Sequence, residues 1–222
     1  MLQHDITRPL LVITGVWNPA ILQPPWIARY LLDKKEGEEF AFMEVGVPDR
    51  PTPIIYINDL GIAASRSRID LFVNTFDPKR CNELEAMCAK ILELLPHTPV
   101  TGLGVNHIFS VSNPQPQLLD KFKTRENIET AYRVIEQVLI SRIELGENVK
   151  LNLRRQISSE KILFDLNFHH EANKADTIRA LLPNVIERTY QQAIETIGSL
   201  YGEHDIEDRG HDFPKQETGG EN

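Results

Sequence analysis

Cysteine is scarce in this 222-residue sequence, which contains only Cys81 and Cys88. They lie seven residues apart in a segment with helical periodicity, so about 10 Å of helix rise separates them, too far for an intrachain disulfide. A small secreted fold held by disulfides is therefore disfavoured. A chain of this length also needs no such support, because it can bury well over half of its unfolded surface.

Long apolar runs are missing as well. No stretch of eighteen apolar residues occurs anywhere in the chain, so no membrane-spanning helix is predicted. Near the start, Gln3, His4 and Asp5 stand where a signal peptide would be basic and then apolar. We therefore expect a cytoplasmic protein that does not associate with membranes.

A surplus of positive charge is also absent, since the formal net charge is -8. Residues 203–222 hold seven acidic side chains against Arg209 and Lys215, and we expect them to form a flexible acidic tail. Nucleic-acid binding cannot be argued from bulk charge, because it calls for a basic domain or stripe. A nucleic-acid accessory role is kept only as an alternative, with Arg66, Arg68, Lys150, Arg154 and Arg155 as its contact residues.

The common enzyme motifs are not found. The sequence contains no Walker loop, nucleophile elbow, zinc-finger cysteine pair or His-Glu-x-x-His helix. Gly102-Leu103-Gly104 follows a predicted helix and enters a predicted strand, the reverse of the order in a phosphate-binding loop. These glycines instead predict a close backbone approach or a strand bend. We expect no cofactor and no resident metal.

Hydrophobic periodicity and turn residues predict the secondary structure. In the first half, Asp77 and Pro78 mark a helix start, and Pro96 marks the end of that helix. A second helix is predicted over 24–35. The predicted strands cover 10–16, 40–47, 53–58, 67–74 and 100–111.

Residues 113–116, Asn-Pro-Gln-Pro, predict a linker to the second half. A helix is predicted over 124–143 from the stripe Ile128, Ala131, Tyr132, Ile135, Val138 and Leu139. Residues 149–157 and 162–170 predict an antiparallel hairpin. The last helix, 174–201, should kink at Pro183 and end at Gly202.

This order of elements predicts an α+β fold, a largely antiparallel sheet with helices packed on one face. We divide the chain into a first α+β half (1–112), a second half on the same core (117–202) and the tail (203–222). The similar strand windows around Asn106 and Asn167 raise the option that the halves are related. Two windows of five residues leave duplication open.

One cluster carries residue types suited to acid–base or metal chemistry: Asp165, His169, His170 and Glu171. Strand alternation points His169 and His170 to opposite faces, so they should not share a metal. A solvated strand end is the alternative interpretation. His107 alternates with apolar residues, which predicts a hydrogen-bonded core or interface histidine.

The predicted hairpin also presents a polar face, whose candidate binding residues are Lys150, Asn152, Arg154 and Gln156, joined by Arg66 and Arg68 from the first half. This face either binds a polar ligand or partner, or is a solvated surface with cross-strand pairs such as Arg154 with Asp165. It lacks the aromatic residues that stack on nucleic-acid bases.

Three segments of the chain carry a resemblance to a known family. They are the helix from Asp77, the strand containing Pro99-Val100-Thr101-Gly102-Leu103-Gly104-Val105-Asn106, and the later strand Ile162-Leu163-Phe164-Asp165-Leu166-Asn167, which precedes a long helix. Together they resemble a sporadically distributed bacterial family of uncharacterised two-half proteins. The resemblance covers about residues 8 to 201. It departs at Val105 and His107, where bulkier or aromatic residues are expected. It implies a fold but no activity and no site residues.

The leading hypothesis is a non-enzymatic binding or assembly module that forms a homo-oligomer or binds a protein partner through strand edges or the polar sheet face. The alternatives are a small-molecule or metal-dependent hydrolase with a site near Asp165 and His169, and a nucleic-acid accessory protein.

Overall fold

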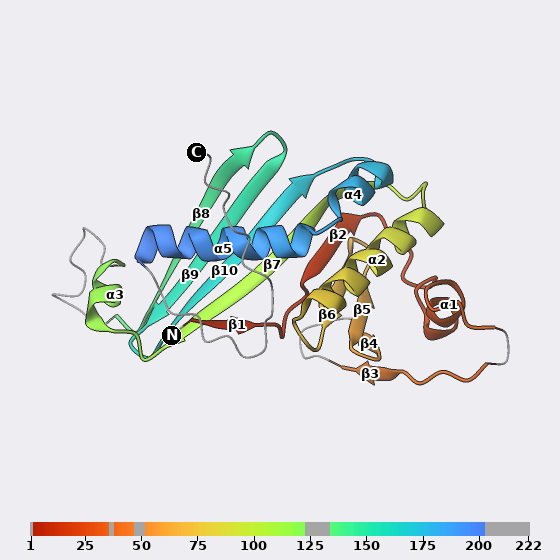
Figure 1. Ribbon diagram of the computed structural model, residues 1–222, viewed down its shortest axis with the longest axis horizontal. Helices are drawn as coiled ribbons and strands as arrows, with labels where there is room; N and C mark the ends of the chain where they lie inside the picture. Colours follow the sequence, from red (N-terminus) through yellow and green to blue (C-terminus); the bar gives the residue numbers. More distant parts are fainter. Residues whose placement is uncertain (1, 36–37, 47–51, 123–133, 203–222) are drawn as a thin grey trace, which may run out of the picture.

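One ten-stranded antiparallel sheet organises the computed structural model, which describes residues 2–35, 38–46, 52–122 and 134–202. Its strand order is β3-β4-β5-β6-β2-β7-β10-β9-β8, and β1 pairs with the free part of β7 (Figure 1). The strands are β1 (Gln3–Asp5), β2 (Leu11–Gly15), β3 (Met43–Val45), β4 (Ile54–Ile57), β5 (Leu60–Ala64), β6 (Arg68–Val73), β7 (Val100–Ser112), β8 (Glu136–Gly146), β9 (Val149–Ser158) and β10 (Lys161–Glu171).

Helices cover one face of this sheet, as the sequence predicts. The described helices are α1 (Pro24–Tyr30), α2 (Pro78–Leu94), α3 (Pro116–Asp120), α4 (Ala175–Leu181) and α5 (Val185–Tyr201). Figure 1 shows α2 in front of the first strands and α5 crossing the later ones. The large apolar core lies between helices and sheet, and its fully buried members include Leu84, Leu103 and Phe164. A second, small buried cluster lies on β4, β5 and β6 and contains Ile54, Ala63 and Phe72. We call the face of the sheet opposite the helices the open face. Where this face carries the groove of the candidate site, none of the described helices covers it.

The start of α2 follows the predicted capping pattern. The Asp77 side chain accepts a hydrogen bond from the backbone N–H of Arg80 at 2.8 Å, and Pro78 occupies the first turn. Cys81 and Cys88 are free and buried on the inner side of this helix, so no disulfide joins them. Burial raises the pKa of both thiols, which keeps them protonated and unreactive.

The predicted helix over 124–143 is wrong where the structure describes it. Residues Glu136–Gly146 form strand β8, paired with β9 over its whole length. The β-branched residues Val138, Ile140 and Ile143 favour a strand, and Asn148 adopts a left-handed φ of 63° in the tight turn to β9. The first part of that prediction lies in 123–133, outside the described residues.

Two further strands were not predicted. β5 (Leu60–Ala64) completes an antiparallel meander with β4 and β6, where the sequence suggested only a connecting segment around Gly61. The turn before it is tight because Asn58 takes a left-handed φ of 54°. β1 (Gln3–Asp5) was also missed, because three residues give no clear alternation.

The predicted helix over 174–201 is two helices, because it is completely interrupted between α4 and α5 at Pro183, where only a kink was predicted. Asn184 has a left-handed φ of 56° there, and Gly202 ends α5 with a φ of 94°. The predicted linker at 113–116 joins β7 to α3. The acidic tail, 203–222, lies outside the described residues. One sheet spans both predicted halves, and their boundaries and relatedness stay predictions.

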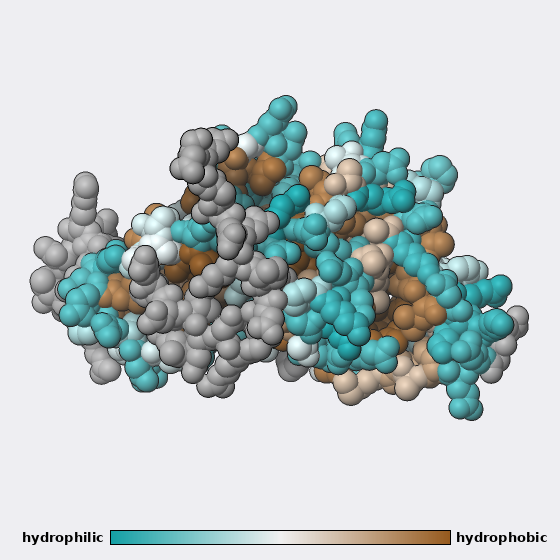
Figure 2. Space-filling model, in the orientation of Figure 1, coloured by the Kyte–Doolittle hydropathy of each residue, from teal (hydrophilic) through white to brown (hydrophobic). Residues whose placement is uncertain are grey.

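The surface of the helix-bearing face is mostly hydrophilic over α2, with hydrophobic residues beside it and near the β8–β9 turn (Figure 2). Among the described residues, no helix is long and apolar enough to cross a membrane.

Candidate functional site

Strand alternation separates two kinds of surface on β7 and β10. Leu103, Val105 and His107 point into the helix-covered core, while Gly104 and Asn106 belong to the open face. The polar side chains of the open face are not enclosed by the core and can contact a ligand. We therefore place the candidate site on this face.

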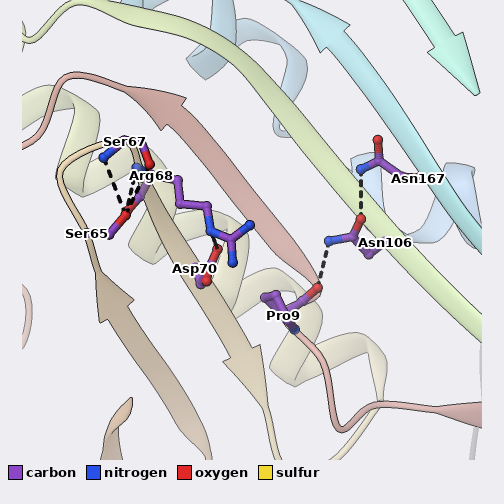
Figure 3. A network of polar contacts seen from close by, with 7 residues as sticks. All are labelled: Pro9, Ser65, Ser67, Arg68, Asp70, Asn106 and Asn167. Atoms are coloured by element: carbon purple, nitrogen blue, oxygen red, sulfur yellow. Dashed lines mark hydrogen bonds and ion pairs between the residues drawn. The ribbon is translucent and has the colours of Figure 1, made fainter. Parts of the chain in front are cut away.

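A row of side-chain hydrogen bonds crosses four strands on the open face, and we call it the amide row. Arg142 Nε donates to Asn152 Oδ1 at 3.0 Å, and Asn152 Nδ2 donates to Asn167 Oδ1 at 2.9 Å. Asn167 Nδ2 then donates to Asn106 Oδ1 at 2.7 Å. Asn106 Nδ2 ends the row on the carbonyl oxygen of Pro9 at 2.9 Å (Figure 3).

The amide row follows from strand register. Asn106 lies directly opposite Asn167, Asn167 opposite Asn152, and Asn152 opposite Arg142. Each asparagine uses its amide as both donor and acceptor, so each bond fixes the orientation of the next side chain. Asn106 and Asn167, the centres of the two similar strand windows in the sequence, are therefore cross-strand partners. This pairing does not show that the two halves arose by duplication.

A groove of about 600 Å³ lies beside the amide row. Segments from five parts of the chain form it: the β1–β2 connection, β2, β6, β7 and β10. Its lining residues are Thr7, Arg8, Pro9, Val12, Thr14, Arg68, Gly104, Asn106, Ile108, Asp165, Asn167 and His169. This volume suits a small molecule or a short peptide segment.

Gly102 and Gly104 of β7 leave space in which two side chains of β10, His169 and Asn167, lie over the β7 backbone. A Cβ on Gly104 would lie 3.0 Å from Asn167 Nδ2, and one on Gly102 would lie 2.8 Å from the His169 ring. A side chain at either position would push Asn167 or His169 away. A Cβ on Gly102 would also lie 2.7 Å from the His170 carbonyl oxygen, so the predicted close backbone approach is confirmed there, while at Gly104 the near group is a side chain.

Two arginines supply positive charge at the groove. Arg8 Nη1 contacts Asp165 Oδ2 at 3.1 Å, and Arg68 Nε contacts Asp70 Oδ1 at 3.1 Å (Figure 3). About half of each arginine side chain stays exposed, with N–H groups beyond those contacts. Burial raises the pKa of Asp165, although the charges of Arg8 and Arg154 act against this shift.

The structure divides the candidate catalytic cluster. Asp165 and His169 both line the groove, but they are four residues apart on an extended strand, so their Cα atoms are about 13 Å apart. His170 is buried on the helix side, and burial lowers its pKa. Glu171 forms an ion pair with Lys150 beyond the groove. No group of three or more metal-ligating residues gathers in the described part of the chain.

The candidate binding residues are also divided. Arg68 lines the groove and Asn152 belongs to the amide row, while Arg66 lies in the β5–β6 turn outside the lining. Arg154 lies directly opposite Asp165, as predicted, although the ion pair of Asp165 is with Arg8. Gln156 lies further along β9, and neither it nor Lys150 lines the groove.

The basic residues proposed for nucleic-acid contact do not form one stripe. Lys150 pairs with Glu171 and Arg68 pairs with Asp70. Arg155 points to the helix side, where Nη1 donates to the Tyr201 hydroxyl at 3.0 Å. Because Arg155 and Lys150 lie on opposite faces of β9, these residues do not present the continuous basic stripe that the nucleic-acid alternative requires.

His107 is a hydrogen-bonded core histidine, as predicted. It is fully buried, and its Nε2 lies 2.9 Å from Thr189 Oγ1 of α5. The Thr189 hydroxyl donates to the Val185 carbonyl at 2.7 Å, so His107 Nε2 is the donor between them. This residue supports the fold and does not reach the groove.

No protein-family model, curated protein or solved structure matches the chain. The expected family resemblance therefore adds no function and no site residue. The lining residues Thr7, Arg8, Val12 and Thr14 were missed from the sequence, because they become neighbours of β10 only through the sheet order. The alternation of β2 could have indicated which of its side chains face outward.

Proposed function

We propose that the protein is a non-enzymatic binding module whose open-face groove holds a small anionic ligand, and that it assembles as a homo-oligomer. The observation that carries the ligand class is the pair of half-exposed arginines, Arg8 and Arg68, at a groove in a chain of net charge -8. A carboxylate or phosphate can take charge-assisted hydrogen bonds from such guanidinium groups.

The polar groups that line the groove favour binding of a polar ligand. Gly104 lines the groove without a side chain and lies against the Asn167 amide, and the amide row fixes the Asn106 and Asn167 side chains before a ligand arrives. Binding then costs little side-chain entropy, because these amides are already ordered. Thr7 and Thr14 add hydroxyl groups along the same lining.

A non-enzymatic role is supported by the spacing of the groove's titratable groups. Asp165 is bonded to Arg8, and Asn167 lies between Asp165 and His169 on the strand, so these two do not form an adjacent acid–base pair. Turnover of a small-molecule ester or phosphate that Asp165→Ala and His169→Ala abolish in folded protein would contradict this part of the proposal.

The ligand class can be tested by isothermal titration calorimetry at low ionic strength, with inorganic phosphate and citrate as probes. We expect saturable binding of at least one anion and a loss of about tenfold or more in affinity for Arg8→Gln and Arg68→Gln, because each removes a charge-assisted contact. Arg66→Gln is the matched control, since Arg66 is exposed but lies outside the lining.

Equal loss for Arg66→Gln would indicate a general charge effect and would contradict a groove site. Absence of binding by both anions would contradict the anionic ligand class. Arg68→Gln also leaves the buried Asp70 without this ion pair, so its melting temperature is measured first and Arg8→Gln provides the independent test.

A further inference from the structure

Strand β8 forms one outer edge of the sheet, and it is unusually long for an edge strand. It contains eleven residues, and in the described part of the chain it pairs only with β9 (Figure 1). The other edge strand, β3, has three residues, a length that limits pairing with another chain. β8 therefore presents the longer row of backbone donors and acceptors.

Apolar side chains are exposed along this edge on both faces of the sheet. Ile140 is 72% exposed, and Val138 is 41% exposed on the same face. On the other face, Ile135, just before the strand, is 78% exposed and Ile143 is 36% exposed. A long edge that no other described strand pairs with, and that exposes these apolar residues, is typical of strands that pair with another chain.

We propose that β8 pairs antiparallel with β8 of a second copy of this chain, with the two-fold axis at Leu139. A two-fold axis perpendicular to the sheet keeps both open faces on one side, so residues pair with residues of the same face. With the axis at Leu139, the paired residues are Ile135 with Ile143, Glu136 with Arg142, Gln137 with Ser141, Val138 with Ile140, and Leu139 with itself.

Each pair in this register joins like chemistry or opposite charge. Apolar residues meet apolar residues, polar meets polar, and Glu136 meets Arg142 twice because of the symmetry. Moving the axis to Ile140 would place Glu136 opposite Glu144 and Val138 opposite Arg142. Moving it to Val138 would place Glu136 opposite Ile140, so the axis at Leu139 is the self-complementary choice.

The inference rests on the homo-oligomer part of the proposed function, but not on the groove. None of the groove's lining residues belongs to β8, so dimer formation and anion binding can fail separately. Arg142 Nε also donates to Asn152 of β9 in the amide row, so pairing with Glu136 of the second copy falls to the Nη groups of Arg142.

The test is a charge exchange across the dyad, followed by native mass spectrometry and light scattering over a range of concentrations. We expect the unaltered protein to be a dimer. Glu136→Arg and Arg142→Glu should each raise the dimer dissociation constant by about tenfold or more, since each places two like-charged pairs opposite one another. Combining both changes in one chain should restore the dimer.

Mixing the two single variants gives the sharpest result. A heterodimer of Glu136→Arg with Arg142→Glu pairs opposite charges at both positions, so it should form while each variant alone is mainly monomeric. Glu144→Arg is the control, because residue 144 would face Val134 and not a charge. Its dimer should be unchanged.

Three results would overturn the inference: a monomer at all concentrations, a dimer insensitive to both single changes, or single variants that do not recover on mixing. A different protein paired on this edge in place of a second copy would appear as a monomer in purified samples and would also overturn it. Anion binding measured on Glu136→Arg shows whether the groove proposal stands independently.

Discussion

Replacing Glu85 by alanine is expected to lower the free energy of unfolding by about 3 kcal/mol. Glu85 lies on the inner side of α2 and is buried, and its two carboxylate oxygens accept hydrogen bonds from the start of α5. The backbone N–H of Asn184 lies 2.8 Å from Oε2, and that of Ile186 lies 2.9 Å from Oε1.

This carboxylate takes the place of a local cap. Asn184 is the N-cap residue of α5, but its side chain makes no capping hydrogen bond. Glu85 therefore satisfies amides that would otherwise be left without partners at a buried helix start, and it joins α2 to α5 across 99 residues of sequence. Burial raises the pKa of Glu85, while the bonds from Ile186 and Asn184 act to lower it.

Urea unfolding and thermal melting would measure the effect of Glu85→Ala. For a chain of this size, about 3 kcal/mol corresponds to a fall of about 6 to 12 °C in melting temperature. Glu93→Ala is the matched control on the same helix, since the Glu93 side chain is 66% exposed. A Glu85→Ala variant as stable as that control would show that the carboxylate does not support α5.

Lowering the pH from 7 to 5 is expected to reduce the free energy of unfolding by up to about 2 kcal/mol through His107 alone. Burial holds the pKa of His107 well below its ordinary value of 6.5, and the neighbouring His4 acts in the same direction. The folded protein therefore keeps this imidazole neutral, while the unfolded chain binds a proton below about pH 6.5.

The direction of the pH effect follows from this difference in proton binding between the folded and unfolded states. Above about pH 6.5 neither state is protonated at His107, and its contribution is constant. Below that pH the unfolded state binds the proton and gains free energy, so stability falls until the folded-state pKa is reached. The aromatic rings of Phe76, Phe109 and Tyr190 around His107 and His4 leave little room for a solvated charge.

Denaturant titrations at several pH values between 7 and 5 would test this prediction with His107→Gln. The variant should be less stable at pH 7, since it disturbs the contact with Thr189, but its stability should fall less on acidification. His97→Gln is the control, because His97 is exposed in the connection before β7. An unchanged pH dependence in His107→Gln would contradict the assignment.

The elements that depend on local sequence were predicted well. The Asp77 cap and the β9–β10 hairpin follow from a residue's own backbone preference or from alternation within a few residues, and Pro183 marked the position of an interruption that proved larger than the predicted kink. The placement of His107 in the core follows from the same alternation.

Strand β8 shows where local pattern fails. Ile135, Val138 and Leu139 fit a helical stripe as well as they fit part of a strand, and the partner strand β9 decides between the two. The groove is harder still, because Arg8 and Asp165 are 157 residues apart and meet only through the sheet order. Glu85 gave one usable signal, an acidic residue within an otherwise apolar helix stripe.

Amide NMR spectra recorded during titration with citrate and phosphate test directly whether the open-face groove binds an anion. We expect the largest chemical-shift changes at the Gly104 backbone amide and the Asn106 and Asn167 side-chain amides, and we expect Arg8→Gln to abolish them. Changes confined to other surfaces, or none at all with both anions, would contradict anion binding in the groove.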